Sequence, residues 1–494
     1  MTFEEYRQYD ALGIAQLIKS GDMAAEEILE TAIRRIEAVN PTLNAVVHSL
    51  FDYGRQMLKE ADPEAPFYGV PFLVKDLGIE VAQTPMWAGS FALKGYISPK
   101  DSHTASLLRK SGLIFLGKTN TPEFGLTAYT EAKVYDPALN PWHSGHSPGG
   151  SSGGAGAAVA SGMTPIATAS DGGGSIRIPA ACCGLFGLKP SRGRNSFGPK
   201  YGEMWGGAVA ENCLSRSVRD SAAYFEMIQA HFPGELYLKG ETHSYQQAIQ
   251  EAPRTLRIGF SSAHTLGGEV HSDCKKALAH ACQLLESCGH IVEEVELPYE
   301  RNDLIKYFLP VIASETAAAI REIGQLRQQR VKRQELEANT WAMNILGKAY
   351  SGAEYAEAKR GWGFLARRMG AFHQKYDILL TPTLATPPIQ TGELQNNAVE
   401  SQLVQWVNRL GSGKLLRQNL DRLADKAFGY IPYTPLSNIS GQPSMSVPLY
   451  WSEQNGLPIG LLFTAPIGEE ICLYQLAAQL EQVQPWKDRW PAES

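Results

Sequence analysis

The chain of 494 residues carries 45 lysines and arginines against 51 aspartates and glutamates, which gives a net charge of −6. Its 44% hydrophobic and 19% charged residues are the composition of a soluble globular protein. Because the basic residues do not cluster, we expect neither a nucleic-acid partner nor binding to an anionic membrane. No stretch reaches the roughly 18 apolar residues that a membrane span needs.

The N-terminus and the cysteines indicate a cytoplasmic protein. The opening MTFEEYRQYDALG is acidic and has neither a basic n-region nor an apolar h-region, so we do not expect a signal peptide. The cysteines form no C-x-x-C pair and are odd in number, which favours reduced, buried thiols over disulfides or a metal site. They are Cys182, Cys183, Cys213, Cys274, Cys282, Cys288 and Cys472.

In the first half of the chain, short apolar runs and glycine-rich segments alternate. Apolar residues recur at three- and four-residue spacing from Leu12 to Ile36 and predict helices that Asn40-Pro41 ends. FYGVPFLVKD (67–76) and LIFLGKTN (113–120) each predict a buried strand, and the first projects Lys75 from its end. AGAAVASG (155–162) predicts a closely packed helix. MTPIATAS (163–170) predicts a strand that leads directly into DGGGSIR (171–177).

The second half continues the alternation of helices and strands. SVRDSAAYFEMIQA (217–230) predicts an amphipathic helix, and LRIGF (256–260), a helix around 271–288 and IVEEVEL (291–297) predict a β-α-β unit. Further predictions are mostly helix over 302–376, a strand at 377–383, a polar helical or loop cap over 390–427, strands at 444–451 and 456–465, and a last helix at 469–482. This pattern predicts the α/β class, and since no repeat or linker divides the chain we expect one domain over residues 1–494.

Several common motifs can be set aside. GHSPG (145–149) and GGSSG (149–153) match the G-x-S-x-G nucleophile elbow, but the segment before them, YDPALNPWH, contains two prolines and makes a poor strand. No Gly-Lys-[Ser/Thr] follows a glycine run, as a phosphate-binding loop requires. No H-E-x-x-H or His/Asp cluster predicts a metal, and we expect no cofactor.

Three features remain, and together they predict a serine nucleophile activated by a lysine. They are Lys75 at the end of an apolar run, a Gly-Gly-Ser-Ser-Gly-Gly loop that begins at residue 149, and Ser175 after three glycines. A serine hydroxyl is a poor nucleophile until a base takes its proton. Lysine has an ordinary pKa of about 10.4, but burial lowers it enough for the amine to act as that base. Backbone N–H groups from residue 172 to 175, free of side chains, can converge on an oxyanion.

The segment GGSSGGAGAAVASG…PIATASDGGGSIRIPAACCGLFGLKPSRGR (149–194) resembles the amidase signature family. GVPFLVKD, GKTNTPEF (117–124), NISGQPSMSVP and GLPIGLLF extend the resemblance over most of the chain, and it is weakest between about 300 and 430. The resemblance implies a single α/β/α domain with a mixed, mostly parallel sheet of about eleven strands covered by helices. The signature core would span about 65–230 and 430–494, and a more variable, partly helical cap would span about 300–430.

The resemblance also implies roles for individual residues. In that family the lysine of the VKD segment is the base, the first serine of the pair is a bridging residue held by a cis peptide, and the serine of GGS-x-R is the nucleophile. These roles fall on Lys75, Ser151 and Ser175. The family's oxyanion donors fall on the backbone of Gly172, Gly173, Gly174 and Ser175.

Neighbouring residues are expected to support this set. Asp171, Arg177 and Ser152 would orient the loop by hydrogen bonds, some of them charge-assisted. Candidates for substrate contact are Asn120, Thr119 and Tyr129, with a turn role equally open for the first two. Trp142, Trp205 and Trp341 are further candidates for aromatic lining, with a place in the core equally open for each. The family commonly has a larger residue at position 172, so Gly172 is expected to widen or loosen the acyl pocket.

The expected activity is hydrolysis of a carboxylic amide, namely a linear, cyclic or aryl amide or a carbamate, through an acyl-enzyme. The substrate would be a small molecule, and the protein a monomer or homodimer. Within the family, the chain resembles the branch that contains 6-aminohexanoate-cyclic-dimer hydrolase.

Two alternatives stay open. One is the glutaminase subunit of the tRNA-dependent amidotransferase, whose nucleophile segment usually continues with Gln where this chain has Ile178. The other is a catalytically inactive scaffold of the same fold, against which the intact Lys75, Ser151 and Ser175 speak.

Overall fold

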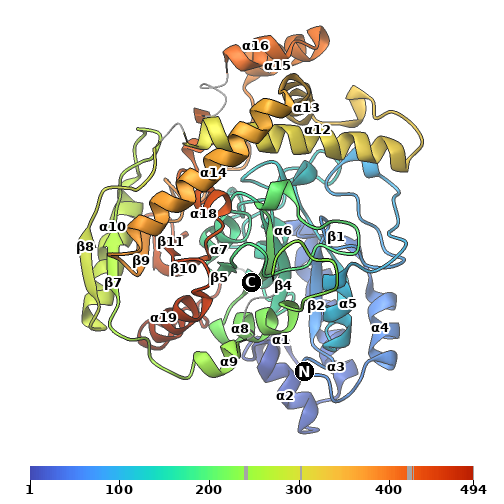
Figure 1. Ribbon diagram of the computed structural model, residues 1–494. Coiled ribbons are helices and arrows are strands. Elements are labelled where there is room, and N and C mark those ends of the chain that lie inside the picture. The colour runs from blue at the N-terminus through green and yellow to red at the C-terminus, as the bar shows by residue number, and fades with distance from the viewer. Residues whose placement is uncertain (239–242, 301–302, 420–424, 427, 493–494) are drawn as a thin grey trace.

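An eleven-stranded mixed sheet runs through the computed structural model of the chain, which describes residues 1–238, 243–300, 303–419, 425–426 and 428–492 (Figure 1). In space the strands lie in the order β1-β3-β2-β4-β6-β5-β10-β11-β9-β7-β8. Their bounds are β1 Val46–Ser49, β2 Pro71–Lys75, β3 Ile114–Thr119, β4 Ile166–Asp171, β5 Phe186–Lys189, β6 Ala210–Ser215, β7 Arg257–Phe260, β8 Ile291–Glu294, β9 Ile378–Pro382, β10 Ser444–Trp451 and β11 Pro458–Thr464. The predicted α/β fold with about eleven strands is therefore confirmed.

The expected predominance of parallel pairing is wrong. Among the described strands, parallel pairing is confined to β3-β2-β4 and β9-β7-β8. The middle of the sheet, from β4 through β6, β5, β10 and β11 to β9, is antiparallel throughout, and β1 is antiparallel to β3. The reason is clearest at β10 and β11, because a six-residue connection is long enough for a hairpin and too short for a parallel crossover.

Helices cover the sheet and extend beyond it at one end (Figure 1). Their bounds are α1 Phe3–Tyr6, α2 Ala11–Lys19, α3 Ala25–Leu43, α4 Phe51–Glu60, α5 His103–Lys110, α6 Gly153–Ala160, α7 Arg177–Cys183, α8 Val218–Ile228, α9 Tyr245–Ala248, α10 Ser272–Ser287, α12 Leu309–Leu326, α13 Ala338–Ala349, α14 Gly352–Phe372, α15 Ala398–Leu410, α16 Gly413–Gln418, α18 Pro435–Ser440 and α19 Glu470–Val483. Short helical turns occur at η1 Phe91–Leu93, η2 Glu123–Gly125, η3 Trp205–Gly207, η4 Leu304–Phe308 and η5 Arg333–Glu335. Within the described residues, none of the helices has both the length and the apolar character to cross a membrane.

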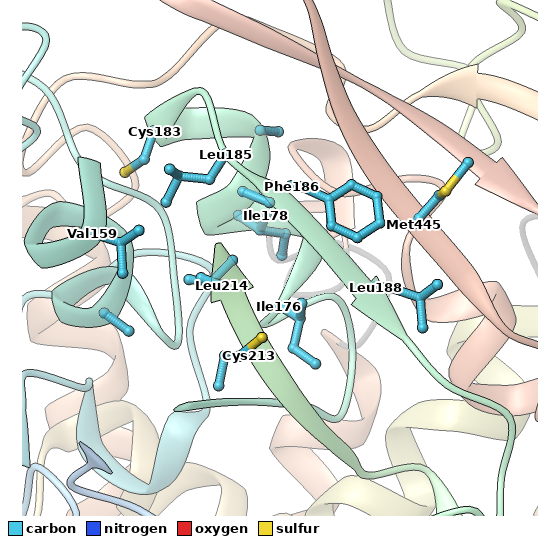
Figure 2. Close-up of a cluster of buried hydrophobic side chains, with 14 of the residues drawn as sticks. Val159, Ile176, Ile178, Cys183, Leu185, Phe186, Leu188, Cys213, Leu214 and Met445 are labelled. Carbon is cyan, nitrogen blue, oxygen red and sulfur yellow. The ribbon is translucent and has the colours of Figure 1, made fainter. Parts of the chain in front are cut away.

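The two faces of the sheet carry different helices, as the neighbouring residues Phe186 and Gly187 of β5 show. The Phe186 ring lies 6.1 Å from the ring of Tyr474 in α19. On the other face, a Cβ built on Gly187 would lie 2.9 Å from the Cβ of Ala180 in α7. Because successive side chains of a strand point to opposite faces, α7 and α19 cover opposite sides. Figure 2 shows the apolar side chains around β5 and β6, with Val159 of α6 and Met445 of β10 beside them.

The fold places two of the predicted features at the same edge of the sheet. β2 and β4 are adjacent and parallel, and every residue of both strands is buried. Lys75 is the last residue of β2, and β4 ends at Asp171, where the glycine segment begins. Because parallel strands end on the same side, Lys75 and the loop before Ser175 come together.

Most of the predicted elements are present, with informative exceptions. The helix that was expected to end at Asn40-Pro41 continues to Leu43 and ends at Asn44, whose φ of 46° is left-handed. Pro41 is tolerated because it lies in the last turn and removes only one hydrogen-bond donor. Strands β1, β5 and β6 were not predicted. β1 and β5 span four residues each, and β5 contains Gly187, while β6 carries Glu211 and Asn212 among small residues.

The described part of residues 300–430, where a partly helical cap was expected, contains several helices and one strand of the main sheet. Helices α12, α13, α15 and α16 lie together at one end of the molecule (Figure 1). Between them in the chain, β9 enters the main sheet and pairs with β11 and β7. The cap is thus anchored in the sheet through β9.

Truncation of Leu73 in β2 tests how far the sheet depends on this strand. Leu73 is fully buried, so we expect Leu73→Ala to lower the free energy of unfolding by about 2–5 kcal/mol, measured by chemical denaturation. The matched control is Leu238→Ala, because Leu238 is 95% exposed. Equal denaturation midpoints for the two variants would contradict the buried position of β2.

Candidate active site

Lys75 and Ser151 form the centre of the candidate site. Lys75 Nζ lies 2.8 Å from Ser151 Oγ and 3.1 Å from Ser170 Oγ, and all three residues are buried. The peptide bond between Gly150 and Ser151 is cis, at the position that the family resemblance implies. The backbone of β2 is held in register because the Lys75 N–H donates to Thr168 Oγ1 of β4 at 2.7 Å. The amine therefore contacts two hydroxyl groups.

Ser175 lies on the wall of a cavity that Ser151 and Ser170 also line. The cavity encloses about 1080 Å³ of empty space, part of it open to solvent. Residues from α12 of the cap form the opposite wall, and they include Ile323 and Leu326. The structure thus brings Lys75, Ser151 and Ser175, which are spread over a hundred residues of sequence, to one solvent-connected site.

Lys75 is buried without a neutralising partner. Within the described part of the chain, no carboxylate lies within ion-pair distance of its amine. Burial lowers the pKa of Lys75 to about 7, although the more distant negative charges of Asp171 and Glu211 act to raise it. Near neutral pH a large fraction of Lys75 is therefore the uncharged amine, the form that accepts a proton.

Of the three glycines before Ser175, Gly174 and Gly172 occupy positions that leave no room for a side chain. Gly174 has a φ of 132°, and a Cβ on it would lie 2.4 Å from Thr434 Oγ1. Its N–H donates to Asp171 Oδ1 at 2.7 Å, which removes Gly174 from the expected set of oxyanion donors. In the described residues no hydrogen-bond acceptor is found for the N–H groups of Gly172, Gly173 and Ser175, so these three can still face a substrate oxygen.

Gly172 does not widen the cavity as expected. A Cβ built there would lie 2.7 Å from Trp205 Cε3 and 2.8 Å from Trp205 Cζ3. The space that the missing side chain leaves is occupied by the indole of Trp205, which also lines the cavity.

Asp171 and Arg177 hold the loop from both ends. They form a buried ion pair at 2.7 Å, and Asp171 also accepts from the N–H of Ile176 at 3.1 Å. All five N–H groups of Arg177 find acceptors, two of them on Asp171 and the others on Thr434, Ser437 and Asn438. Burial alone would raise the pKa of Asp171, but Arg177 outweighs it and lowers the pKa to about 2. The loop is therefore fixed to α18, about 260 residues further along the chain.

The other predicted residues lie around the site and not on the cavity wall. The Ser152 hydroxyl donates to the Ser170 carbonyl at 3.4 Å, which supports the residue that contacts Lys75. Asn120 donates from Nδ2 to the carbonyls of Asn44 and Asp136 and thus joins two loops. Thr119 is buried in β3, and the backbone of Tyr129 packs against Gly150. The geometry therefore gives Asn120, Thr119 and Tyr129 structural positions.

Two of the three tryptophan candidates also lie off the cavity wall. Trp142 donates from its indole to the carbonyl of Cys183 at 2.8 Å. Trp341 packs against a small apolar cluster that contains Ile320 and Ile323, and thus lies behind the cavity wall that Ile323 helps to form. Only Trp205 lines the cavity.

Glu211 is a cavity residue that the sequence interpretation missed. It lies in β6 directly across from Ser170 of β4 and is buried. Thr104 donates to its Oε2 at 2.7 Å. Burial raises the pKa of Glu211 to about 7, against the hydrogen bond from Thr104 and the positive charge of Lys75. The available signal was an acidic residue inside the apolar run AVAENCL (208–214).

Two other lysines are as deeply buried as Lys75 but differ in their surroundings. Lys118 donates to the carbonyl of Ile79 at 3.1 Å, and Lys189 donates to the carbonyl of Pro190 at 2.7 Å. Burial lowers the pKa of Lys118 to about 8 and that of Lys189 to about 7. Lys75 differs from both because its amine contacts the hydroxyl groups of Ser151 and Ser170. In the described residues no group of three or more His, Cys, Asp and Glu side chains is arranged to hold a metal ion.

The chain is similar to known proteins in both sequence and fold. The family described as Amidase matches residues 27–473. The chain is 34% identical over 492 residues to 6-aminohexanoate-cyclic-dimer hydrolase of Pseudomonas sp. (strain NK87), covering 98% of this chain and 96% of that protein. It is 33% identical to a lipoamidase of Enterococcus faecalis, covering 97% of this chain and 63% of the lipoamidase. A solved structure of 6-aminohexanoate cyclic dimer hydrolase superposes with a TM-score of 0.88 and 33% identity, covering 99% of both chains.

Removal of Arg177 tests whether the buried ion pair holds the loop. Arg177→Met leaves the Asp171 carboxylate buried and unpaired, so we expect a loss of about 3–5 kcal/mol in the free energy of unfolding, measured by chemical denaturation. The control is Arg257→Met, which breaks the exposed pair with Glu293 and is expected to leave stability almost unchanged. Equal losses in both variants would rule out the bracing role of Arg177.

Proposed function

The chain belongs to the amidase family, and on that basis we propose that it hydrolyses amides with Ser175 as nucleophile, Ser151 as proton relay and Lys75 as base. The observation that carries the proposal is the 2.8 Å contact between a buried lysine amine and a serine hydroxyl, on a cavity that Ser175 shares. A serine needs a base to attack a carbonyl, and Lys75 is the base that the site offers.

In the proposed first half-reaction, Ser175 Oγ attacks the amide carbonyl carbon. Its proton passes to Ser151, whose own proton passes to the neutral amine of Lys75. The negative oxygen of the tetrahedral intermediate faces the N–H groups of Gly172, Gly173 and Ser175. The ammonium of Lys75 then returns the proton through Ser151 to the substrate nitrogen, the C–N bond breaks, and the amine leaves an ester on Ser175.

In the second half-reaction, water attacks the ester carbonyl and gives its proton to Lys75 by the same route. Collapse of the second tetrahedral intermediate returns the proton to Ser175 and releases the carboxylic acid. Glu211 and Asp171 supply negative charge near Lys75, which lessens the cost of the ammonium that forms in each half-reaction.

The proposed substrate is a small-molecule amide, either linear or cyclic. The relatives that share most of the length of this chain include 6-aminohexanoate-cyclic-dimer hydrolases, and a structure of one of them is complexed with substrate. A bacterial aryl acylamidase of the amidase signature family has a similar fold, with a TM-score of 0.84 and 27% identity. The lining of the cavity is largely apolar, as is common in sites that bind small molecules.

The glutaminase alternative has weaker support. The similarity to a glutamyl-tRNA(Gln) amidotransferase structure from Thermotoga maritima is 23% in sequence with a TM-score of 0.71, which reflects the fold alone. The named relatives that are at least 30% identical over most of this chain include hydrolases, a lipoamidase and putative amidases.

Labelling with a fluorophosphonate tests the nucleophile directly. We expect one covalent adduct on Ser175, located by peptide mass spectrometry, and none in Ser175→Ala. Turnover of amide substrates should fall roughly 10³-fold or more in both Ser175→Ala and Lys75→Met. Lys189→Met is the matched control, since it removes an equally buried lysine whose amine donates to the carbonyl of Pro190 and not to a serine hydroxyl, and it should keep its activity. An unlabelled Ser175 in the folded wild-type protein would overturn the mechanism and favour an inactive scaffold.

The pH dependence follows from the state of Lys75. The protonated amine cannot accept a proton, so kcat/KM should rise with pH and level off above about pH 7. Glu211 also titrates with a pKa of about 7, and Glu211→Gln separates the two groups. Because loss of its negative charge lowers the pKa of Lys75, the variant should keep the rise but shift it to lower pH. Disappearance of the rise in Glu211→Gln would assign it to Glu211 and contradict Lys75 as the titrating base.

A further inference from the structure

We propose that Trp205 sets the size of the substrate group bound beside Ser175, and that Gly172 lacks a side chain because the indole takes its place. The proposal rests on the proposed function, since it concerns substrate bound at the same cavity. It identifies a specificity-determining pair that lies outside Lys75, Ser151 and Ser175.

The first support is the close approach of the two residues. Trp205 Cε3 and Cζ3 would lie 2.7 and 2.8 Å from a Cβ at position 172, closer than atoms pack without displacement. Gly172, Trp205 and Ser175 all line the cavity. The indole therefore stands against the beginning of the nucleophile loop, where a bound substrate must pass.

The second support is the backbone that carries the indole. Trp205 has a φ of 50°, in the left-handed region that a bulky residue rarely adopts, and Gly206 and Gly207 follow with φ of 58° and 85°. Unfavourable backbone geometry of this kind persists only where the surroundings enforce it, and it concentrates at ligand-binding sites.

The surroundings of this turn do enforce its geometry. Lys359 of α14 donates to the carbonyl of Gly206. Arg192 donates from Nε to the carbonyl of Gly207 at 2.5 Å. Two cationic side chains from separate parts of the chain thus hold the backbone of the turn that carries the indole.

The third support is the chemistry of the remaining wall. Leu93, Phe124, Val209, Ile323 and Leu326 give the cavity an apolar lining. The wall also contains Glu80 and Glu211, and the charged pair of Lys200 and Glu322 is internally neutralised at 2.9 Å. The apolar part of the wall, together with Trp205, fits an uncharged alkyl or aryl group that adjoins the scissile carbonyl.

The test compares two series of amides in the wild type, Trp205→Phe and Trp205→Ala. One series consists of p-nitroanilides of carboxylic acids from acetic to decanoic acid, and the other consists of hexanamides with N-substituents from methyl to naphthyl. We expect the ratio of kcat/KM for the largest over the smallest member of one series to rise roughly tenfold or more in Trp205→Ala. Trp142→Ala is the control, because it removes an indole that is not on the cavity wall.

A second pair of variants tests the fit between the two residues. Gly172→Ala places a methyl group against the indole, so we expect it to slow fluorophosphonate labelling of Ser175. The double variant Gly172→Ala with Trp205→Ala should recover labelling to within a few-fold of Trp205→Ala alone, because the methyl group then has space. Failure of the second substitution to rescue the first would overturn the inference that Gly172 accommodates Trp205.

The outcomes separate this inference from the proposed function. If the wild type forms no adduct on Ser175, the proposed function fails and the size proposal fails with it. If Ser175 is labelled and amides are hydrolysed, but the Trp205 variants keep the wild-type preference in both series, only the proposal about Trp205 is overturned.

Discussion

The arrangement of the site depends on the burial of the Lys75 amine. In the described structure no carboxylate lies within ion-pair distance of this amine. Burial of an ammonium group is energetically unfavourable, so the pKa of Lys75 is lowered to about 7 and the amine loses its proton near neutral pH. The strand that carries it is buried on both sides, and serine hydroxyl groups surround its amine. A carboxylate within ion-pair distance would stabilise the ammonium form and keep Lys75 protonated. The absence of such a partner in the described structure therefore favours the neutral amine.

In the loop that carries Ser175, in contrast to Lys75, the buried charged groups are paired with each other. Its ion pair, Asp171 with Arg177, is fully satisfied by hydrogen bonds and fully buried. The bare backbone between the two residues would otherwise be the most mobile part of the site, since glycine has the most conformational freedom. The ion pair between Asp171 and Arg177 joins the two ends of the loop and therefore restricts the motion of the glycine backbone between them.

Lys75, the Gly-Gly-Ser-Ser-Gly-Gly loop and Ser175 can be singled out from the sequence because each lies in a distinctive local pattern, whereas the choice of Ser151 within the loop depends on the family resemblance. A long apolar run ends in a lysine, a serine pair stands among glycines, and a serine follows three glycines. Local pattern also predicts most long helices and the buried strands β2, β3, β4, β9, β10 and β11. It fails for β5 and β6, whose short runs contain glycine or polar residues. The antiparallel middle of the sheet was missed as well, because strand direction depends on connections that periodicity does not encode.

The remaining errors concern contacts between distant segments. Whether Asn120 faces substrate or a neighbouring loop depends on how residues 44 and 136 lie beside it. The place of Trp205 against Gly172 depends on three consecutive residues with positive φ, of which only the two glycines give a sequence signal. The engagement of the Gly174 N–H by Asp171, in contrast, was open to prediction, since an Asp before a glycine run often accepts from a backbone N–H a few residues later.

The link between Arg177 and α18 also has a consequence for the order of events during synthesis. Thr434, Ser437 and Asn438 reach the ribosome exit about 260 residues after Arg177, so the guanidinium stays incompletely bonded while the middle of the chain is made. Lys75, Ser151 and Ser175 are all present in this nascent chain, but the loop that carries Ser175 lacks its hydrogen bonds to the segment around α18. If the proposed mechanism holds, the site is therefore complete only after almost the entire polypeptide has emerged.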